Sequence, residues 1–498
     1  MAVTDTRHPP PAHPRGIWVL AMTEMWERFT YYGMRALLVL FLVSTVNEGG
    51  FGLDDRTAAA IYGLYTAGIY LMALPGGWIA DRLTGQRNAI LAGGVLITAG
   101  NLVLCVAPSL TSFCAGLAVI ATGVGLLKPN ASAIVGSLYP EGGARRDAGF
   151  SLFYMGINAG GFLGPIVAGL VAQHASRRLG FAVAALGMVV GLAQFWHARR
   201  HLGAADEGLR DGGGPALKPF GPAWYPLLGG LAVVLAGAVL LRLGVFGVDA
   251  PLLSRYTAGM IVAMAAAYFA YLLLLADITP VERGRAVVIL ILFIASTLFW
   301  SGYEQAGSSL NLFAERYTDR TIGFLHWEMP AEMLQAFPSL FVILFAPVFT
   351  WIWLALARRN LSPGAPYKFA FGLFLMGTGF LVMVGAAHVV TAGGRPLPTW
   401  LITTYLLHTF GELAVSPVGL SYITKLAPRR LVGQVMGLWF LSNSLGNLAA
   451  GLAAGGYSAD NVAAFPAQFL QVFALAAGAA LVLVVIARPV RRLMAGVD

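Results

Sequence analysis

Four ionisable side chains near the amino terminus lie in a stretch that is otherwise apolar enough to cross a bilayer. They are Glu24, Glu27, Arg28 and Arg35. An ionisable group at the centre of a membrane helix costs about 2.5 to 3.5 kcal/mol on insertion scales, so four impose a penalty on the order of 10 kcal/mol unless they pair or meet water. At 100° per residue, all four fall on one helical face. The spacing predicts a polar stripe that faces a cavity.

Three further ionisable residues lie deep in apolar segments: Lys128, Glu304 and Glu412. Together with the stripe they give four carboxylates against three cations. One carboxylate is therefore a candidate to hold a proton at neutral pH, because burial and a like-charged neighbour both favour its protonated form. The cations lie only in the first half of the chain, so ion pairs with Glu304 and Glu412 would join the two halves as gates.

The composition is that of a polytopic membrane protein. The chain has 498 residues, of which 58% are hydrophobic and 11% charged, with a mean hydropathy of +0.73. Its pI of about 9.6 does not indicate nucleic-acid binding, because the basic residues stand singly or in pairs between apolar segments. Cys105 and Cys114 are interpreted as buried thiols without a role. The polar start, Met1 to Arg15, precedes a retained first helix and is not a signal peptide.

Hydropathy divides the chain into fourteen candidate membrane helices, which predicts an all-α fold. The spans are 17–45, 57–80, 88–107, 110–136, 148–174, 179–197, 224–244, 254–276, 286–314, 335–357, 367–389, 398–424, 432–456 and 465–487.

The distribution of Lys and Arg and the lengths of the loops divide these spans into domains. With both termini cytoplasmic, the cytoplasmic segments hold 21 Lys and Arg and the other side eight, which agrees with the positive-inside rule. We expect a six-helix bundle over 1–200, a cytoplasmic linker over 201–223, an inserted transmembrane hairpin over 224–280 and a second six-helix bundle over 281–498. Two six-helix bundles around a midplane site are typical of transporters.

The loop after the second span resembles the signature loop of the major facilitator superfamily. It carries Asp81-Arg82 and Gly85 in the expected order between two spans. The alternative is a generic positive-inside loop with a glycine turn.

The chain as a whole resembles the proton-dependent oligopeptide transporter family. The likeness rests on five elements: Glu24-x-x-Glu27-Arg28 followed by Tyr31-Tyr32-Gly33, Lys128-Pro129-Asn130, Phe153-Tyr154 with Asn158, Phe299-Trp300 before Glu304-Gln305, and Gly411-Glu412-Leu413 before Ser416-Pro417. The resemblance implies a symporter that imports di- and tripeptides with protons by alternating access.

The resemblance also implies roles for particular residues. Proton coupling would involve Glu24, Glu27, Arg28, Lys128, Glu304 and Glu412. The outer gate would be the pair of Arg35 and Glu304, and the inner gate that of Lys128 and Glu412. The substrate site would comprise Tyr32, Arg35, Tyr65, Lys128, Tyr154, Asn158, Trp300, Glu412 and Trp439, with Tyr303 beside them.

A dipeptide is a zwitterion, and the charges of the site suit its two ends. Arg35 and Lys128 suit the carboxylate, whereas Glu412 and Asn158 suit the amine. One departure from the family concerns an asparagine near the amine, where this chain reads Gln335-Ala-Phe-Pro338-Ser339. Gln335 and Ser339 are the candidate replacements.

Some alternatives remain open at this stage. His408, one turn before Glu412, is either a core hydrogen-bonding residue or a partner that shares the proton of Glu412. A related symporter for nitrate, or a drug exporter, would have the same architecture. We expect no enzyme, no metal and no cofactor apart from the proton as coupling ion, and a monomer in a bacterial inner membrane.

Overall fold

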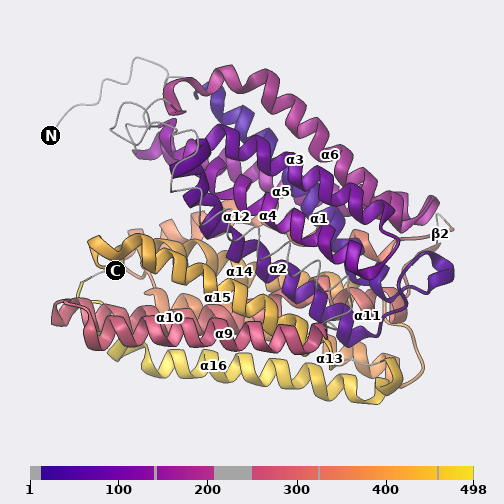
Figure 1. Ribbon diagram of the computed structural model, residues 1–498. Coiled ribbons are helices and arrows are strands. Elements are labelled where there is room, and N and C mark those ends of the chain that lie inside the picture. The colour runs from indigo at the N-terminus through magenta and orange to yellow at the C-terminus, as the bar shows by residue number, and fades with distance from the viewer. Residues whose placement is uncertain (1–12, 140–142, 207–248, 324–325, 457–458, 497–498) are drawn as a thin grey trace.

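The computed structural model describes residues 13–139, 143–206, 249–323, 326–456 and 459–496, and these form long helices packed side by side (Figure 1). The helices are α1 (Arg15–Val43), α2 (Asp55–Ile79), α3 (Gln86–Val106), α4 (Leu110–Ser137), α5 (Gly143–His174), α6 (Arg177–Ala198), α9 (Ala250–Ala270), α10 (Pro280–Tyr303), α11 (Ser309–Tyr317), α12 (Phe337–Arg358), α13 (Ala365–Thr391), α14 (Thr399–Leu426), α15 (Val432–Ala454) and α16 (Phe465–Leu493).

Short elements complete the described chain. A 3-10 turn, η6 (Glu304–Gly307), joins α10 to α11, and another, η8 (Ala331–Ala336), leads into α12. The strands β1 (Thr321–Ile322) and β2 (Trp327–Glu328) pair antiparallel beside η8 in the chain. Ten of the described helices, counted with their short continuations, are long and apolar enough to cross a membrane.

The predicted all-α membrane fold is confirmed, with most span ends within a few residues of the helix ends. The predicted span 224–244 lies outside the described residues. The predicted span 286–314 lies within one apolar helical stretch, Pro280–Tyr317, but the α-helix is interrupted there, because α10 ends at Tyr303 and η6 precedes α11. This break places Glu304 at a helix end, where its side chain faces the first half of the protein.

The described helices pack in two groups, α1 to α6 and α10 to α16, with α9 outside both. Contacts join α1 to α5 and α6, and α3 to α4 and α6, whereas α13 packs with α14 and α16, and α10 with α15. The two groups meet mainly where α2 lies along α15 and where α5 lies along η8 and α12. Helix α9 packs against both α2 and α15, so it covers this seam from outside (Figure 1).

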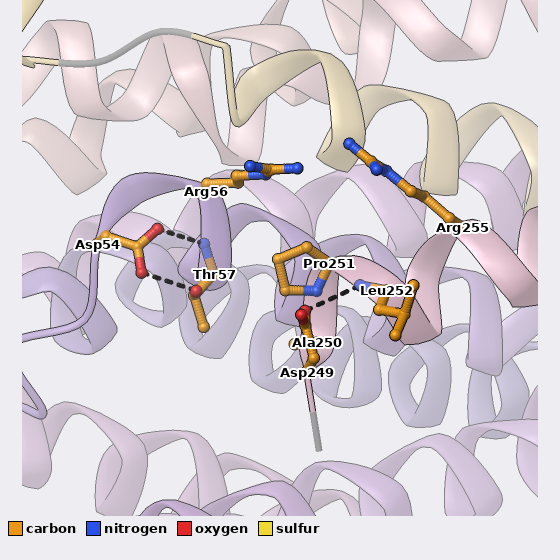
Figure 2. Close-up of a pocket in the computed structure, with 8 residues that line it drawn as sticks. All are labelled: Asp54, Arg56, Thr57, Asp249, Ala250, Pro251, Leu252 and Arg255. Atoms are coloured by element: carbon orange, nitrogen blue, oxygen red, sulfur yellow. Dashed lines mark hydrogen bonds between the residues drawn. The ribbon is translucent and has the colours of Figure 1, made fainter. Parts of the chain in front are cut away.

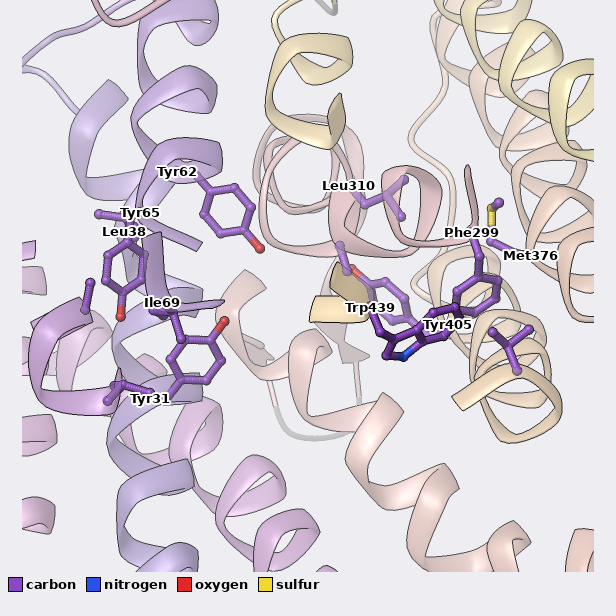
Figure 3. Packing of buried hydrophobic residues seen from close by; sticks show 14 of the residues in the cluster. Tyr31, Leu38, Tyr62, Tyr65, Ile69, Phe299, Leu310, Met376, Tyr405 and Trp439 are labelled. Atoms are coloured by element: carbon purple, nitrogen blue, oxygen red, sulfur yellow. The ribbon is translucent and has the colours of Figure 1, made fainter. Parts of the chain in front are cut away.

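The core is divided between the two groups in the same way. Figure 3 shows Tyr31, Tyr62 and Tyr65 projecting from the first group, whereas Phe299 and Trp439 come from the second. All five side chains are buried. Both groups therefore contribute buried aromatic side chains to the core.

Glycines bring α1 and α5 into direct backbone contact. A Cβ on Gly156, Gly160 or Gly164 would lie 2.4, 2.0 or 2.3 Å from a carbonyl oxygen of α1. Their spacing of four residues forms one small-residue face, which allows membrane helices to approach closely. The backbone of α1 that carries the charged stripe is thereby held against α5.

We predict that Gly160→Ala destabilises the protein. The new methyl group would lie 2.0 Å from the Met25 carbonyl oxygen, so α1 and α5 must separate. The expected loss is about 1–3 kcal/mol of unfolding free energy, measured as a lower thermal unfolding midpoint in detergent.

The matched control is Gly478→Ala on α16, where a methyl group would meet nothing within 4 Å. It should leave the midpoint unchanged or raise it slightly, because alanine is the better helix former. Equal midpoints for the two variants would contradict the proposed packing constraint.

Candidate functional site

The stripe of α1 forms a compact buried ion cluster. Glu24, Glu27 and Arg28 are all at most 5% exposed. Arg28 Nη2 donates to Glu27 Oε1 at 2.8 Å, Arg28 Nε also contacts Glu27, and Arg28 Nε lies 3.6 Å from Glu24 Oε1. Glu24 Oε2 is buried without a hydrogen-bond partner in the described structure. One guanidinium thus serves two carboxylates, and one carboxylate oxygen is left over.

Arg35, about two turns further along α1, contacts the other half of the protein. Its Nη2 lies 2.8 Å from Glu304 Oε2, and its Nε donates to the Tyr62 hydroxyl at 2.7 Å. The Tyr62 hydroxyl in turn lies 3.3 Å from Glu304 Oε2. Gly307 is needed beside it, because a Cβ there would lie 2.2 Å from the same hydroxyl oxygen. The pair expected between Arg35 and Glu304 is therefore formed, with Tyr62 as a third member.

Glu412 and Tyr303 face each other within the second group. The Tyr303 hydroxyl donates to Glu412 Oε2 at 2.5 Å. Both residues line a cavity of about 40 Å³ between the groups, whose wall consists of Tyr32, Arg35, Asn158, Tyr303, Ala306, Gln335, Pro338, Ser339, Val342 and Glu412. This volume holds a few water molecules at most. A dipeptide would have to widen it.

Lys128 lies apart from Glu412. Its ammonium nitrogen stands 5.4 Å from the centre of the Tyr70 ring, a cation–π contact. No hydrogen bond or ion pair joins Lys128 to Glu412 in the described part of the chain. The pair expected at the inner gate is not formed in this conformation.

The remaining predicted substrate residues fall into two sets. Tyr32 and Asn158 line the cavity, and Asn158 Nδ2 donates to the Tyr154 carbonyl at 2.9 Å. Tyr65, Tyr154, Trp300 and Trp439 do not line it in this conformation. Tyr65 is buried with an unpartnered hydroxyl, and the Tyr154 side chain is 39% exposed.

The two predicted tryptophans pack within the second group. Trp439 stacks edge-on against Phe369, and Trp300 against Tyr303. Trp300 therefore lies behind the cavity wall through Tyr303, whereas the aromatic partner of Trp439 does not line the cavity.

Sequence reasoning missed Tyr62 and Tyr70. Both lie on α2 on the same broad face as Tyr65, so helical periodicity alone did not separate the three tyrosines. Their contacts with Arg35 and Lys128 depend on how α2 is placed against α1 and α4.

A second set of ion pairs joins the two groups at the end where α1 finishes and α2 begins, which we call the far end. Arg177 Nη2 lies 2.6 Å from Glu315 Oε1, and Arg177 Nε lies 3.5 Å from Glu332 Oε1. Arg316 forms a bidentate pair with Asp55, at 2.6 and 2.7 Å. These residues flank the apolar spans, so their positions along the chain did not indicate a set of ion pairs between the groups.

His408 behaves as a core residue. It is 1% exposed, neither ring nitrogen has a hydrogen-bonding side-chain partner in the described structure, and its ring packs on those of Tyr303 and Phe380. Sharing of a proton with Glu412 has no support in these contacts.

A larger cavity of about 380 Å³ lies away from this constellation, between the starts of α2 and α9 (Figure 2). Its carboxylates are used as helix caps: Asp54 accepts from Thr57, and Asp249 from the Leu252 amide. It contains none of the buried ionisable residues described above. We therefore take the smaller, central cavity as the candidate site. In the described residues, no group of three or more His, Cys, Asp and Glu side chains is placed to hold a metal ion.

Comparison with known proteins gives consistent results. The model of the POT family, PTR2, matches residues 87–205 and 260–468. The peptide transporter YePEPT of Yersinia enterocolitica is 40% identical over 493 residues, which cover 97% of this chain and 95% of the relative. A di-/tripeptide transporter of Lactococcus lactis is 34% identical over 443 residues, covering 86% of this chain and 87% of the relative.

A solved structure has the same fold. It is a crystal structure of a variant of a peptide transporter POT in complex with alafosfalin, with a TM-score of 0.87 and 37% identity. The similarity covers 98% of each chain. The packing of both helix groups thus has a close counterpart in an experimental structure.

We predict that Tyr62→Phe destabilises the closed pair. Removal of the hydroxyl takes from Arg35 Nε the hydrogen-bond partner that it has among the described residues, in a buried site. An unpaired buried donor costs about 1–3 kcal/mol, so the thermal unfolding midpoint in detergent should fall.

Tyr65→Phe is the matched control on the same helix, because the Tyr65 hydroxyl has no partner to lose. Its midpoint should stay at or above that of the wild type. A Tyr62→Phe variant as stable as the wild type would rule out an energetic role for this contact.

Proposed function

This chain belongs to the POT family, and from that premise we propose that it carries di- and tripeptides into the cell together with protons. It is a multi-pass membrane transporter and not an enzyme. The observation that carries the proposal is the division of buried charge, since Arg35 pairs with Glu304 across the two groups while Lys128 and Glu412 stay apart.

The central cavity suits a zwitterionic ligand. Glu412 offers a carboxylate to the peptide amine, and Asn158 offers its amide oxygen beside it. We propose that Arg35 and Lys128 attract the carboxylate, once the cavity has widened. Tyr32 would lie along the peptide, whereas Tyr65, Tyr154, Trp300 and Trp439 would contact it only after rearrangement.

We propose that the two charge pairs are gates that open in turn. In this conformation Arg35 and Glu304 close the far end, reinforced by the ion pairs of Arg177 and Arg316. Lys128 is free to pair with Glu412 when that end opens. The alternating pairs would prevent both ends from opening at once.

Proton coupling is proposed for the cluster of Glu24, Glu27, Arg28 and Lys128, with Glu304 and Glu412 in the opposing group. Arg28 shares one guanidinium between two carboxylates, and the unpartnered Glu24 Oε2 supports a protonated side chain at that position. A proton on Glu27 would remove the main partner of Arg28 and free its charge. That charge would then be available to the rest of the cavity.

An anion carrier is the alternative function. Nitrate has no amine, so Glu412 and its Tyr303 hydrogen bond would face an anionic substrate unfavourably. The buried carboxylate of the cavity therefore favours a peptide over nitrate.

The membrane arrangement is also a proposal. We place both termini in the cytoplasm of a bacterial cell, which makes the far end periplasmic, and assign 1–200 and 281–498 as the two bundles. Residues 201–223 would be the linker and 224–280 the inserted hairpin. We propose a monomer as the working unit.

The first test is uptake of labelled dialanine into proteoliposomes. With an inward proton gradient, dialanine should accumulate above its outside concentration, and collapse of the gradient by an uncoupler should reduce it to equilibrium. Equal uptake under both conditions would eliminate proton symport, and no uptake at all would eliminate dialanine as a substrate.

The second test separates coupling from binding. We expect Glu27→Gln to abolish gradient-driven accumulation but to retain counterflow exchange of dialanine, because the neutral side chain mimics a permanently protonated carboxyl group. Parallel loss of both activities would mean that Glu27 contributes to folding or peptide binding and does not couple protons.

A further inference from the structure

Gln335 lies in the wall of the central cavity. It lies in η8, two residues before α12 begins, and its side chain is 7% exposed. Its Nε2 atom is buried and has no hydrogen-bond partner in the described structure. Buried amide donors are nearly always paired in folded proteins. An unpaired donor in a substrate cavity therefore points to a ligand acceptor.

Gln335 has the amide donor on this wall that is free to bind a ligand, since its neighbours either have no donor or use it within the protein. Pro338 has no N–H and no polar side chain, so it contributes no hydrogen bond. On the facing wall, the Arg35 guanidinium is engaged by Glu304 and Tyr62. Asn158 uses its Nδ2 on the Tyr154 carbonyl and presents its acceptor oxygen. The cavity thus has acceptors at Glu412 and Asn158 and a free amide donor at Gln335.

These donors and acceptors match the start of a peptide. With the amine at Glu412, the next polar group of the ligand is the carbonyl oxygen of its first peptide bond, which is an acceptor only. We propose that Gln335 Nε2 donates a hydrogen bond to this carbonyl and thereby makes Gln335 a specificity-determining residue. The inference rests on the proposed peptide transport, and it identifies the part of the peptide that Gln335 recognises.

Ser339 differs from Gln335 in the ligand group that its side chain can select. Ser339 also lines the cavity, but its hydroxyl lies against α5, where a Cβ on Gly161 would come within 2.3 Å of it. A hydroxyl can donate and accept, so it imposes no preference for an acceptor. Ser339→Ala is therefore the matched control on the same wall.

The experiment uses three ligands that differ only in the peptide bond. They are dialanine, its ketomethylene isostere, which keeps the carbonyl but replaces N–H by CH₂, and its (E)-alkene isostere, which lacks both. Binding to purified full-length protein is measured by thermal stabilisation without a gradient, and inhibition of labelled dialanine uptake is measured in proteoliposomes.

In the wild type and in Ser339→Ala, the ketomethylene isostere should bind about tenfold more tightly than the alkene, the effect of one lost hydrogen bond to a buried donor. In Gln335→Met, which keeps the size but removes the donor, the ratio should fall to near one. Gln335→Ala gives the same test if the methionine variant is poorly expressed. Each ratio comes from one preparation, so it does not depend on the folded fraction.

A ratio that stays near ten in both Gln335 variants would overturn the inference, and so would a wild-type ratio near one. Either result leaves peptide transport intact as long as dialanine is still accumulated. A wild type that neither binds nor accumulates dialanine would instead contradict the proposed function.

Discussion

The structure depends on one constraint: charges buried in a low-dielectric interior must be paired. Arg35 finds its partner in Glu304 across the interface between the two groups, and Arg28 finds two partners on its own helix. Breaking a buried pair leaves an uncompensated charge in the interior. This costs far more free energy than replacing both charged residues by apolar ones. Since the cations of the stripe belong to one group and the opposing carboxylates to the other, separation of the groups always requires a replacement partner. A proton, a zwitterion or water can fill that role.

The constraint also explains why the central cavity is small in this conformation. Arg35 is paired with Glu304, and Glu412 accepts a hydrogen bond from Tyr303. The side chains proposed to bind a zwitterion therefore already have partners within the protein. A ligand must exchange these internal contacts for its own. The net gain per contact is then modest, which suits a carrier that has to release its substrate on the other side of the membrane.

The sequence predicts the fold well because the bilayer leaves few alternatives: long apolar runs must be helices, and their ends carry the turn and charge signals. The charge distribution predicts ion pairs between the two halves, and the family resemblance implies the specific pair of Arg35 with Glu304, which is formed. It did not predict Tyr62 or Tyr70, because an aromatic residue on a membrane helix is equally compatible with packing and with hydrogen bonding. The break at Glu304 and the far-end ion pairs were missed for a different reason. They depend on the tertiary approach of segments whose local composition resembles ordinary helix ends and loops.

The glycine seam between α1 and α5 has a mechanical consequence. Without side chains between the two backbones, there is no soft layer in which one helix can slide or rotate against the other, so the pair is stiff. Asn158 lies on α5 between Gly156 and Gly160 in sequence, but its side chain lines the central cavity, whereas the charged cluster lies on α1. Because the two backbones are in direct contact, a displacement of α1 moves α5 with it, and so also moves the cavity-lining Asn158.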